Sequence, residues 1–317
     1  MKGTLLLKFP PELTSIDAYW GLLEAHMARV LILDFDGTLT DAEAEGLPYR
    51  QGYLEDVALL ADVPIEDVKE WATEMDGELQ RRPGDFGWRF NEKIVAPACV
   101  DPYLRIMPIA RMVLDRVHAF PNPNERDRLL DRILYKYNYQ KTNTVFRPGA
   151  AEFFSRLREL ESGEAPLYTI VVTNSHTVPV QNKIRLLGER HNINFDWLVD
   201  RVVGSARKYV VDDSVTTLPE SIRIPNLKRP IYVRRSQYHT ILSQILRDYD
   251  SSWTETIVLG DIFELDLSLP LSMGSTVGLM VNPFSPQYEV DYLKDHQQGA
   301  VHTDLASALQ WIEDLHS

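Results

Sequence analysis

The 317-residue sequence predicts an α/β fold, in which a parallel β-sheet with helices on both faces is interrupted by an inserted helical domain. Two observations indicate this class. Short, continuous apolar runs alternate with segments whose apolar residues have helical spacing, which is typical of a parallel sheet buried on both faces. A long stretch in the first half of the chain breaks this alternation and has helical periodicity almost throughout.

The apolar runs are interpreted as strands. They lie at 30–33, 167–173, 230–233, 256–260 and 277–281. A short helix is expected before the first run, at 16–28, and apolar residues at helical spacing predict further helices around 153–160, 241–246 and 305–312. The segments 200–213 and 229–235 both look extended, and we expect them to form a small hairpin at the edge of the sheet.

The inserted segment covers about a hundred residues, 45–145, and contains no convincing strand. Its helical spacing is clear in the set Ile65, Val68, Trp71, Ala72 and Met75. The chain returns to the sheet where Pro148 and Gly149 open a helix. We therefore divide the chain into a catalytic core, 1–44 with 146–317, and a helical cap domain, 45–145.

The overall charge and the cysteine count exclude several classes of partner. Asp and Glu number 46 against 33 Lys and Arg, so the formal net charge is −13 and nucleic acid or an anionic membrane surface is a poor partner. The single cysteine, Cys99, cannot form an internal disulfide, which fits a reducing, cytoplasmic environment. No apolar run approaches the roughly 20 residues of a membrane span. A soluble protein is expected, and the sequence gives no indication of its oligomeric state.

Polar side chains follow three of the predicted strands. Asp34 and Asp36 come after the first strand, Thr173 and Asn174 after the second, and Asp261, followed by Asp266, after the run at 256–260. Ligands of an open parallel sheet bind beyond the carboxyl ends of its strands. The sequence thus predicts at least four acids, with hydroxyl and amide groups, around one crevice.

Carboxylates crowded in this way are unfavourable unless a cation lies among them, because like charges keep one another protonated. Magnesium suits such a site, since it binds carboxylates, water and substrate phosphate oxygens. With the metal in place, one carboxylate can attack phosphorus as a nucleophile. A second carboxylate two residues further on can move the proton of the leaving group. The acids therefore predict a bound Mg²⁺ and an anionic, phosphorylated substrate.

Three segments of the sequence resemble motifs of a known family. The run D-F-D-G-T-L-T-D at 34–41, a strand ending in Thr173, and G-D-I-F-E-L-D at 260–266 look like motifs I, II and IV of the haloacid dehalogenase-like (HAD) hydrolase superfamily. The resemblance covers 29–44 and 146–317. It implies a Rossmann-like core, and it places the helical insert where the family carries its C1-type cap.

The resemblance also implies a role for each matched residue. Asp34 would be the nucleophile that forms an aspartyl-phosphate, and Asp36 the general acid/base, with its backbone carbonyl facing the metal. Thr173 and Asn174 would hydrogen-bond the transferring phosphoryl group. The implied metal site consists of Asp34, Asp36, Asp261 and Asp266, with Asp261 binding Mg²⁺ directly and Asp266 supporting it. An acid at position 36 favours a phosphatase or a phosphomutase over a dehalogenase or an ion-pumping ATPase.

Motif III departs from the family pattern. The family places a lysine at the start of the helix before the motif IV strand, and this sequence has Arg234 there instead. Lys208, further upstream, is the alternative. Both would supply a cation, but only arginine could bind phosphate through a bidentate fork. We slightly prefer Arg234.

Taken together, these features predict a magnesium-dependent phosphatase of a small phosphorylated metabolite. A phosphomutase of the same superfamily is the alternative enzyme. A catalytically silent binding or regulatory protein on the same fold is the alternative from another class. It is suggested by the absence of the motif III lysine from its usual place and by the expected hairpin, which matches no motif of the family. The substrate is not encoded in any motif that we can quote.

Overall fold

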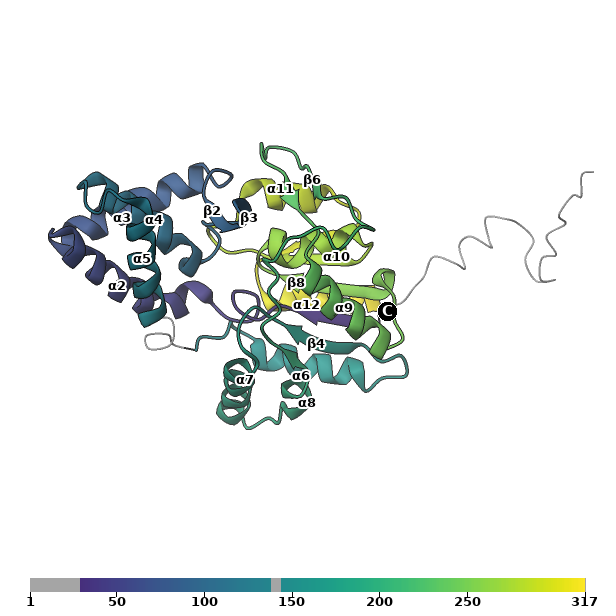
Figure 1. The fold of residues 1–317 in the computed structure, drawn as a ribbon. Coiled ribbons are helices and arrows are strands. Elements are labelled where there is room, and N and C mark those ends of the chain that lie inside the picture. The colour runs from purple at the N-terminus through teal and green to yellow at the C-terminus, as the bar shows by residue number, and fades with distance from the viewer. Residues whose placement is uncertain (1–28, 138–143, 317) are drawn as a thin grey trace, which may run out of the picture.

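The computed structural model describes residues 29–137 and 144–316. The helix expected at 16–28 lies outside the described residues. A parallel sheet and its covering helices form one part of the molecule, and a group of helices forms the other, at the left of Figure 1. Within the described residues, no helix is both long enough and apolar enough to cross a membrane.

The central sheet has six strands, all paired in parallel, in the order β10-β9-β8-β1-β4-β5. Its strands are β1 (Val30–Leu33), β4 (Tyr168–Val172), β5 (Val202–Val203), β8 (Thr256–Gly260), β9 (Thr276–Met280) and β10 (Gly299–His302). The predicted α/β class is confirmed, and four of the five predicted apolar runs lie in this sheet. Strand β1 lies between β4 and β8, so Asp34, which directly follows β1, is at the centre of the sheet.

Both faces of the sheet are buried, which explains why its strands are continuous apolar runs. Leu31 and Leu33 pack into one hydrophobic cluster, while Val30 and Ile32 pack into the other. The first cluster is completed by α6 (Ala150–Glu161), α7 (Thr177–His191), α8 (Asp196–Val199) and α12 (Leu305–His316). The second is completed by α9 (Ser236–Asp248), α10 (Ser268–Ser272) and α11 (Gln287–Asp295).

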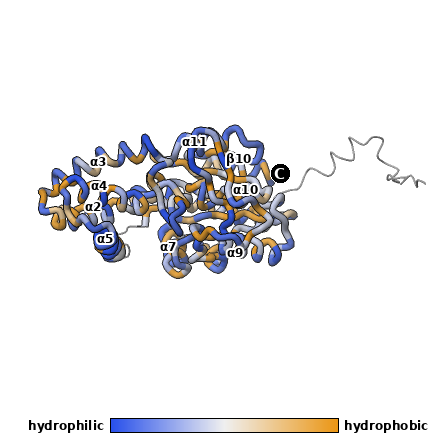
Figure 2. The backbone as a smooth tube through the Cα atoms, turned by 45° about the horizontal axis from the view of Figure 1, so that its top comes forward, coloured by the Kyte–Doolittle hydropathy of each residue, from blue (hydrophilic) through white to orange (hydrophobic). Residues whose placement is uncertain are grey.

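The inserted segment is mainly helical, as predicted. It contains α2 (Ala42–Ala61), α3 (Ile65–Arg81), α4 (Pro102–Arg116) and α5 (Pro123–Tyr137), which share a hydrophobic cluster of their own. Hydrophobic and hydrophilic residues alternate along these helices in Figure 2, as expected for helices that each bury one face. The boundaries 45 and 145 stay a prediction; α2 itself already begins at Ala42.

The expectation that the insert contains no strand was wrong. Strands β2 (Gly87–Phe90) and β3 (Lys93–Pro97) form an antiparallel hairpin within it. The two turn residues, Asn91 and Glu92, have φ values of 47° and 62°. Two-residue hairpin turns with positive φ at both positions usually carry glycine at one of them. Glutamate replaces that glycine here, so the usual sequence signal is missing.

The prediction of a hairpin between 200–213 and 229–235 was also wrong. The first segment contributes β5 to the edge of the parallel sheet, and the second contributes β7 (Ile231–Tyr232), which pairs with β6 (Ser221–Ile222). Ser205 and Arg207 both have positive φ values, 55° and 46°. Such left-handed residues interrupt an extended strand. They turn the chain away from the sheet directly after β5 and leave the following residues as loops.

Candidate active site

Three of the four acids predicted from the strand ends meet at the carboxyl ends of the central strands. Asp34 directly follows β1, and Asp261 directly follows β8, its parallel neighbour. Asp266 lies in η2 (Phe263–Leu267), a short π-helical turn after β8 that returns its carboxylate to the strand ends. Carboxylate oxygens of these three buried residues lie within 4.8 Å of one another.

The glycine of motif I allows this close approach. Gly37 has a φ of 82°, a left-handed conformation that glycine adopts without strain. A Cβ atom at this position would lie 2.0 Å from Oδ2 of Asp261. Any other residue would therefore either displace Asp261 or distort the loop that follows Asp34.

Lys208 supplies the positive charge among the acids. Its Nζ donates to Oδ1 of Asp34 at 2.6 Å and to Oδ1 of Asp266 at 2.8 Å, and its side chain is 1% exposed. Burial alone would lower the pKa of Lys208, but the adjacent Asp266 and Asp34 outweigh burial and raise it. The lysine is thus held as a cation against the candidate nucleophile.

The preference for Arg234 over Lys208 was wrong. Arg234 donates through Nε to the carbonyl of Leu218 at 2.9 Å and through Nη1 to Asp213 at 3.2 Å, in a surface loop. Its neighbour Arg235 is fully buried, but it binds the carbonyl of Lys208 at 2.7 Å, not a carboxylate. The arginine that the motif spacing selected is engaged elsewhere, and the lysine reaches the site from a long loop.

Asp36 lies apart from the three clustered carboxylates. Its Oδ2 accepts a hydrogen bond from Ser175 Oγ at 2.6 Å, and its Oδ1 accepts one from Lys183 Nζ at 3.3 Å. Among the described residues, the carboxylates of Asp34, Asp261 and Asp266 lie close enough together to bind one metal ion. The carboxylate of Asp36 is not part of this group. Only its predicted contribution through the backbone carbonyl remains, and that stays a prediction.

Thr173 and Asn174 follow β4 at the same edge of the sheet, beside β1. The Thr173 hydroxyl is buried and accepts from the backbone N–H of Ser175 at 3.1 Å. Oδ1 of Asn174 accepts from the backbone N–H of Lys208 at 2.8 Å. Asn174 therefore positions the lysine loop, and the predicted binding of phosphate by both residues stays a prediction.

Sequence reasoning missed several residues that support the site. Thr38 donates to Oδ2 of Asp34 at 3.1 Å and lies 3.5 Å from Oδ1 of Asp261. Arg147 donates through Nε and Nη2 to the carbonyl of Gly37, at 3.0 and 2.7 Å. The position of Thr38 directly after Gly37 was a usable signal. The contacts of Arg147 depend on tertiary structure, which no local pattern reveals.

The electrostatics of the cluster favour a divalent cation. Burial is the largest effect on Asp34 and raises its pKa to about 7, although Lys208 opposes the rise. Burial and the neighbouring Asp34 and Asp266 raise the pKa of Asp261 well above its ordinary value. Buried Oδ2 of Asp261 has no hydrogen-bond partner in the part of the chain that the structure describes. When all three carboxylates are ionised, they and the Lys208 ammonium together carry a charge of −2, which a hard cation such as Mg²⁺ would neutralise.

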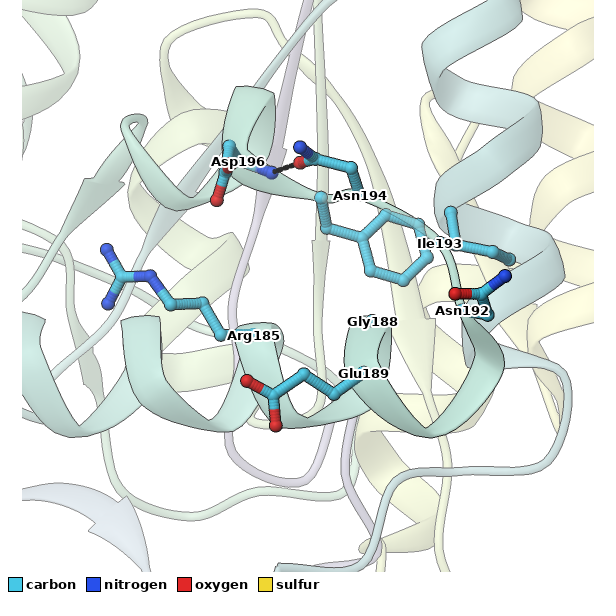
Figure 3. Close-up of a pocket in the computed structure, with 8 residues that line it drawn as sticks. Arg185, Gly188, Glu189, Asn192, Ile193, Asn194 and Asp196 are labelled. Carbon is cyan, nitrogen blue, oxygen red and sulfur yellow. Dashed lines mark hydrogen bonds between the residues drawn. The ribbon is translucent and has the colours of Figure 1, made fainter.

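A separate surface pocket of about 400 Å³ lies between α7 and the segment that leads into α8 (Figure 3). Arg185 and Glu189 on the helix face Asn194 and Asp196 across it. Asn194 uses its side-chain oxygen to accept from the backbone N–H of Asp196 at 2.7 Å. None of the clustered acids lines this pocket, so the candidate chemistry is located at the strand ends.

Comparisons with known proteins find similarity in structure. No protein-family model matches the sequence, and no curated protein matches it. A predicted phosphoglycolate phosphatase from Haemophilus somnus 129PT has 14% identity and a TM-score of 0.49, with 91% of this chain and 99% of that chain covered. A HAD-family hydrolase from Deinococcus radiodurans R1, solved with phosphate and sodium, has 15% identity, a TM-score of 0.45 and coverages of 92% and 97%. A 2-haloacid dehalogenase from Pseudomonas syringae pv. tomato DC3000 has 15% identity, a TM-score of 0.41 and coverages of 92% and 100%.

The structure also has the features that the sequence motifs imply. The chain has a parallel sheet, a mainly helical insertion after its first strand, and buried acids that converge after β1 and β8. This is the arrangement implied by the resemblance of motifs I, II and IV to the HAD-like hydrolases.

Proposed function

We propose that this protein is a magnesium-dependent phosphatase that hydrolyses a small phosphorylated metabolite through an aspartyl-phosphate on Asp34. One observation carries the proposal. The carboxylate of Asp34 is bound by Lys208 on one oxygen and by Thr38 on the other, and it lies beside the free oxygen of Asp261. Asp34 is a buried carboxylate that faces a cation on one side and the unpaired carboxylate oxygen of Asp261 on the other. This arrangement suits attack on a metal-bound phosphate.

Asp34 and Asp261 are the residues that would hold magnesium. Asp266 would support the site from behind, because its two oxygens already accept from Lys208 at 2.8 Å and from the backbone N–H of Ile262 at 3.0 Å. Magnesium would neutralise the clustered carboxylates and the phosphate oxygens. Lys208 would add a fixed positive charge on the side of the nucleophile.

The proposed reaction has two steps, which are formation and hydrolysis of the aspartyl-phosphate. Asp34 attacks phosphorus, the bond to the leaving oxygen breaks, and Asp36 donates its proton to that oxygen. Water next attacks the same phosphorus, Asp36 takes its proton, and the Asp34–phosphorus bond breaks to release inorganic phosphate. Lys208 keeps its position in both steps, because Asn174 and Arg235 bind its backbone on either side.

The insert would cover the side of the active site that faces it. Ile262 and Leu265, from the segment that carries Asp261 and Asp266, pack into the hydrophobic cluster of the insert. The insert would therefore exclude bulk water from the acids and contact the leaving group of the substrate. The contact between Lys208 and Asp34 supports the enzyme over the alternative of a catalytically silent binding protein, because it provides a lysine beside the candidate nucleophile.

The proposal is tested by phosphate release. Purified protein is incubated with p-nitrophenyl phosphate and with a panel of phosphorylated metabolites, in magnesium and in EDTA. Turnover should require magnesium and should be lost in Asp34→Asn. The matched control is Asp250→Asn, an exposed acid that precedes β8 at the opposite end of the sheet, and it should keep full activity. Turnover that survives in Asp34→Asn, or that is absent across the panel, would refute the proposal.

A further inference from the structure

Lys183 contacts the candidate general acid but belongs to none of the sequence motifs. It lies on α7, and its Nζ donates to Oδ1 of Asp36 at 3.3 Å. Ser175 Oγ donates to the other carboxylate oxygen at 2.6 Å. Both oxygens of Asp36 are therefore held from the α7 side of the site, and the side chain of Asp36 is 31% exposed.

Lys183 is itself held by a buried acid from the insert. Its Nζ lies 3.2 Å from each carboxylate oxygen of Glu45, which is on α2 and 3% exposed. Glu45 also accepts from the backbone N–H of Val145 at 3.0 Å. A lysine that is 21% exposed and pairs with two acids has fewer alternative positions than a surface lysine.

These contacts lie at the two connections between the sheet and the insert. The connections run side by side: Thr40 forms an antiparallel bridge with Phe146, and the backbone N–H of Asp41 donates to the carbonyl of Val145 at 2.8 Å. Glu45 joins the outgoing connection to the returning one. Lys183 thus links this junction to Asp36.

We propose that Lys183 is a positioning residue that holds the Asp36 carboxylate for proton transfer, with Glu45 anchoring Lys183 to the junction with the insert. This inference rests on the proposed phosphatase function and deepens it. A surface ion pair would contribute little to catalysis. A positioning residue matters only when the leaving group needs a proton, because its effect is transmitted through Asp36.

The test compares two leaving groups. An alkyl phosphate that the wild-type protein hydrolyses has a poor leaving group and needs the proton, whereas 2,4-dinitrophenyl phosphate does not. The value compared is kcat/KM, because it reports the steps up to formation of the phosphoenzyme and not the later attack of water. Lys183→Gln should lower kcat/KM for the alkyl phosphate by about tenfold or more, within the range of general acid catalysis. The loss for dinitrophenyl phosphate should be much smaller.

Four further variants show whether the effect of Lys183 acts through Asp36. Lys183→Arg keeps the charge and should recover most of the lost rate. Asp36→Asn should show the same dependence on the leaving group, and the double variant with Lys183→Gln should lose no more than Asp36→Asn alone. Arg185→Gln, an exposed residue on the same helix, is the matched control and should change neither substrate. Circular dichroism and thermal melting verify that each variant is folded.

The outcomes separate this inference from the function on which it rests. If Lys183→Gln loses the same factor on both substrates, or loses nothing, Lys183 does not position Asp36. That result leaves the phosphatase intact as long as Asp34→Asn is inactive. If Asp34→Asn retains turnover, the phosphatase itself is refuted.

Discussion

Lys208 makes the contact on which the proposed chemistry depends most. It bridges Asp34 and Asp266, whereas Arg234 binds a surface loop. The acids were predictable because each follows an apolar run. The lysine was not, because it lies in a long irregular segment whose path is set by tertiary contacts. The spacing of motif III selected the wrong cation for this reason.

Lys208→Ala should lower kcat by about a hundredfold or more, which is the usual loss when a fixed electrostatic partner of a transition state is removed. Arg234→Ala should keep activity within about threefold, since surface substitutions away from a site have small effects. Steady-state kinetics on p-nitrophenyl phosphate measure both. Equal losses in the two variants would contradict the placement of Lys208.

Glu289 gives a prediction about pH. It is fully buried, and neither of its carboxylate oxygens has a hydrogen-bond partner among residues 29–137 and 144–316. Burial, and then the neighbouring Glu264, raise its pKa well above the ordinary value. The pKa of Glu289 is higher in the folded protein than in the unfolded protein. Its contribution to the free energy of unfolding is therefore fully present below the unfolded pKa and is lost as the pH rises through the folded pKa.

Glu289→Gln should therefore stabilise the protein at pH 8, by about 1–3 kcal/mol, since an unpaired buried acid no longer has to lose its proton or carry a charge. The gain should shrink toward zero as pH falls below the ordinary pKa of glutamate. Urea unfolding at several pH values measures this difference. Glu164→Gln, an exposed acid, is the control and should show no such trend. A stabilisation independent of pH would argue against a titrating Glu289.

The strands of the central sheet show which elements a sequence predicts well. Strands buried on both faces are continuous apolar runs, so β1, β4, β8 and β9 could be located before the structure was known. The hairpin of β2 and β3 could not, because its turn has Asn91 and Glu92 at positive φ without a glycine. This missed hairpin touches the site: Trp88 and Phe90 pack against Tyr209, next to Lys208, with ring centroids 4.3 and 5.8 Å apart.

Arg235 joins this hairpin to the loop that carries Lys208. It donates to the carbonyl of Val95 on β3 at 2.9 Å and to the carbonyl of Lys208 at 2.7 Å, and it is fully buried. Arg235→Met would leave both carbonyls without this donor. We expect a loss of about 2–4 kcal/mol in the free energy of unfolding and a lower kcat, because the backbone of Lys208 is released. Arg234→Met is the matched control one residue away, and an equal loss there would contradict this role.

At the scale of the whole molecule, the sequence predicted the α/β class and the insertion, and the structure confirms both. The connections between the two parts could not be predicted. They are held by contacts such as Glu45 with Val145, a hundred residues apart, which leave no local pattern. The exclusion of nucleic acid and anionic membranes, based on the net charge of −13, remains a prediction.

If the protein binds magnesium as proposed, the metal should stabilise the whole fold, because the proposed site brings together Asp34 and Asp261, which only the folded chain places side by side. At a hundred times its dissociation constant, a ligand of the folded state adds about 2.7 kcal/mol. For a chain of this size, we expect a rise in melting temperature of roughly 4 °C. Calorimetry with and without EDTA measures the shift.

Asp261→Asn should abolish this magnesium effect. It should also raise the melting temperature without metal, because it removes a buried carboxylate whose pKa is raised by burial and by Asp34. Asp250→Asn should keep the full magnesium shift. A magnesium shift that persists in Asp261→Asn would place the metal elsewhere.

Trapping the intermediate tests most directly whether Asp34 becomes covalently phosphorylated. Asp36→Asn, which should form the phosphoenzyme from 2,4-dinitrophenyl phosphate but hydrolyse it slowly, is mixed with that substrate and magnesium and then treated with borohydride. Reduction of an aspartyl-phosphate converts the residue to homoserine, which peptide mass spectrometry locates. We expect homoserine at position 34, and none when magnesium is withheld. Homoserine at another acid, or no modified residue while phosphate is still released, would contradict this expectation.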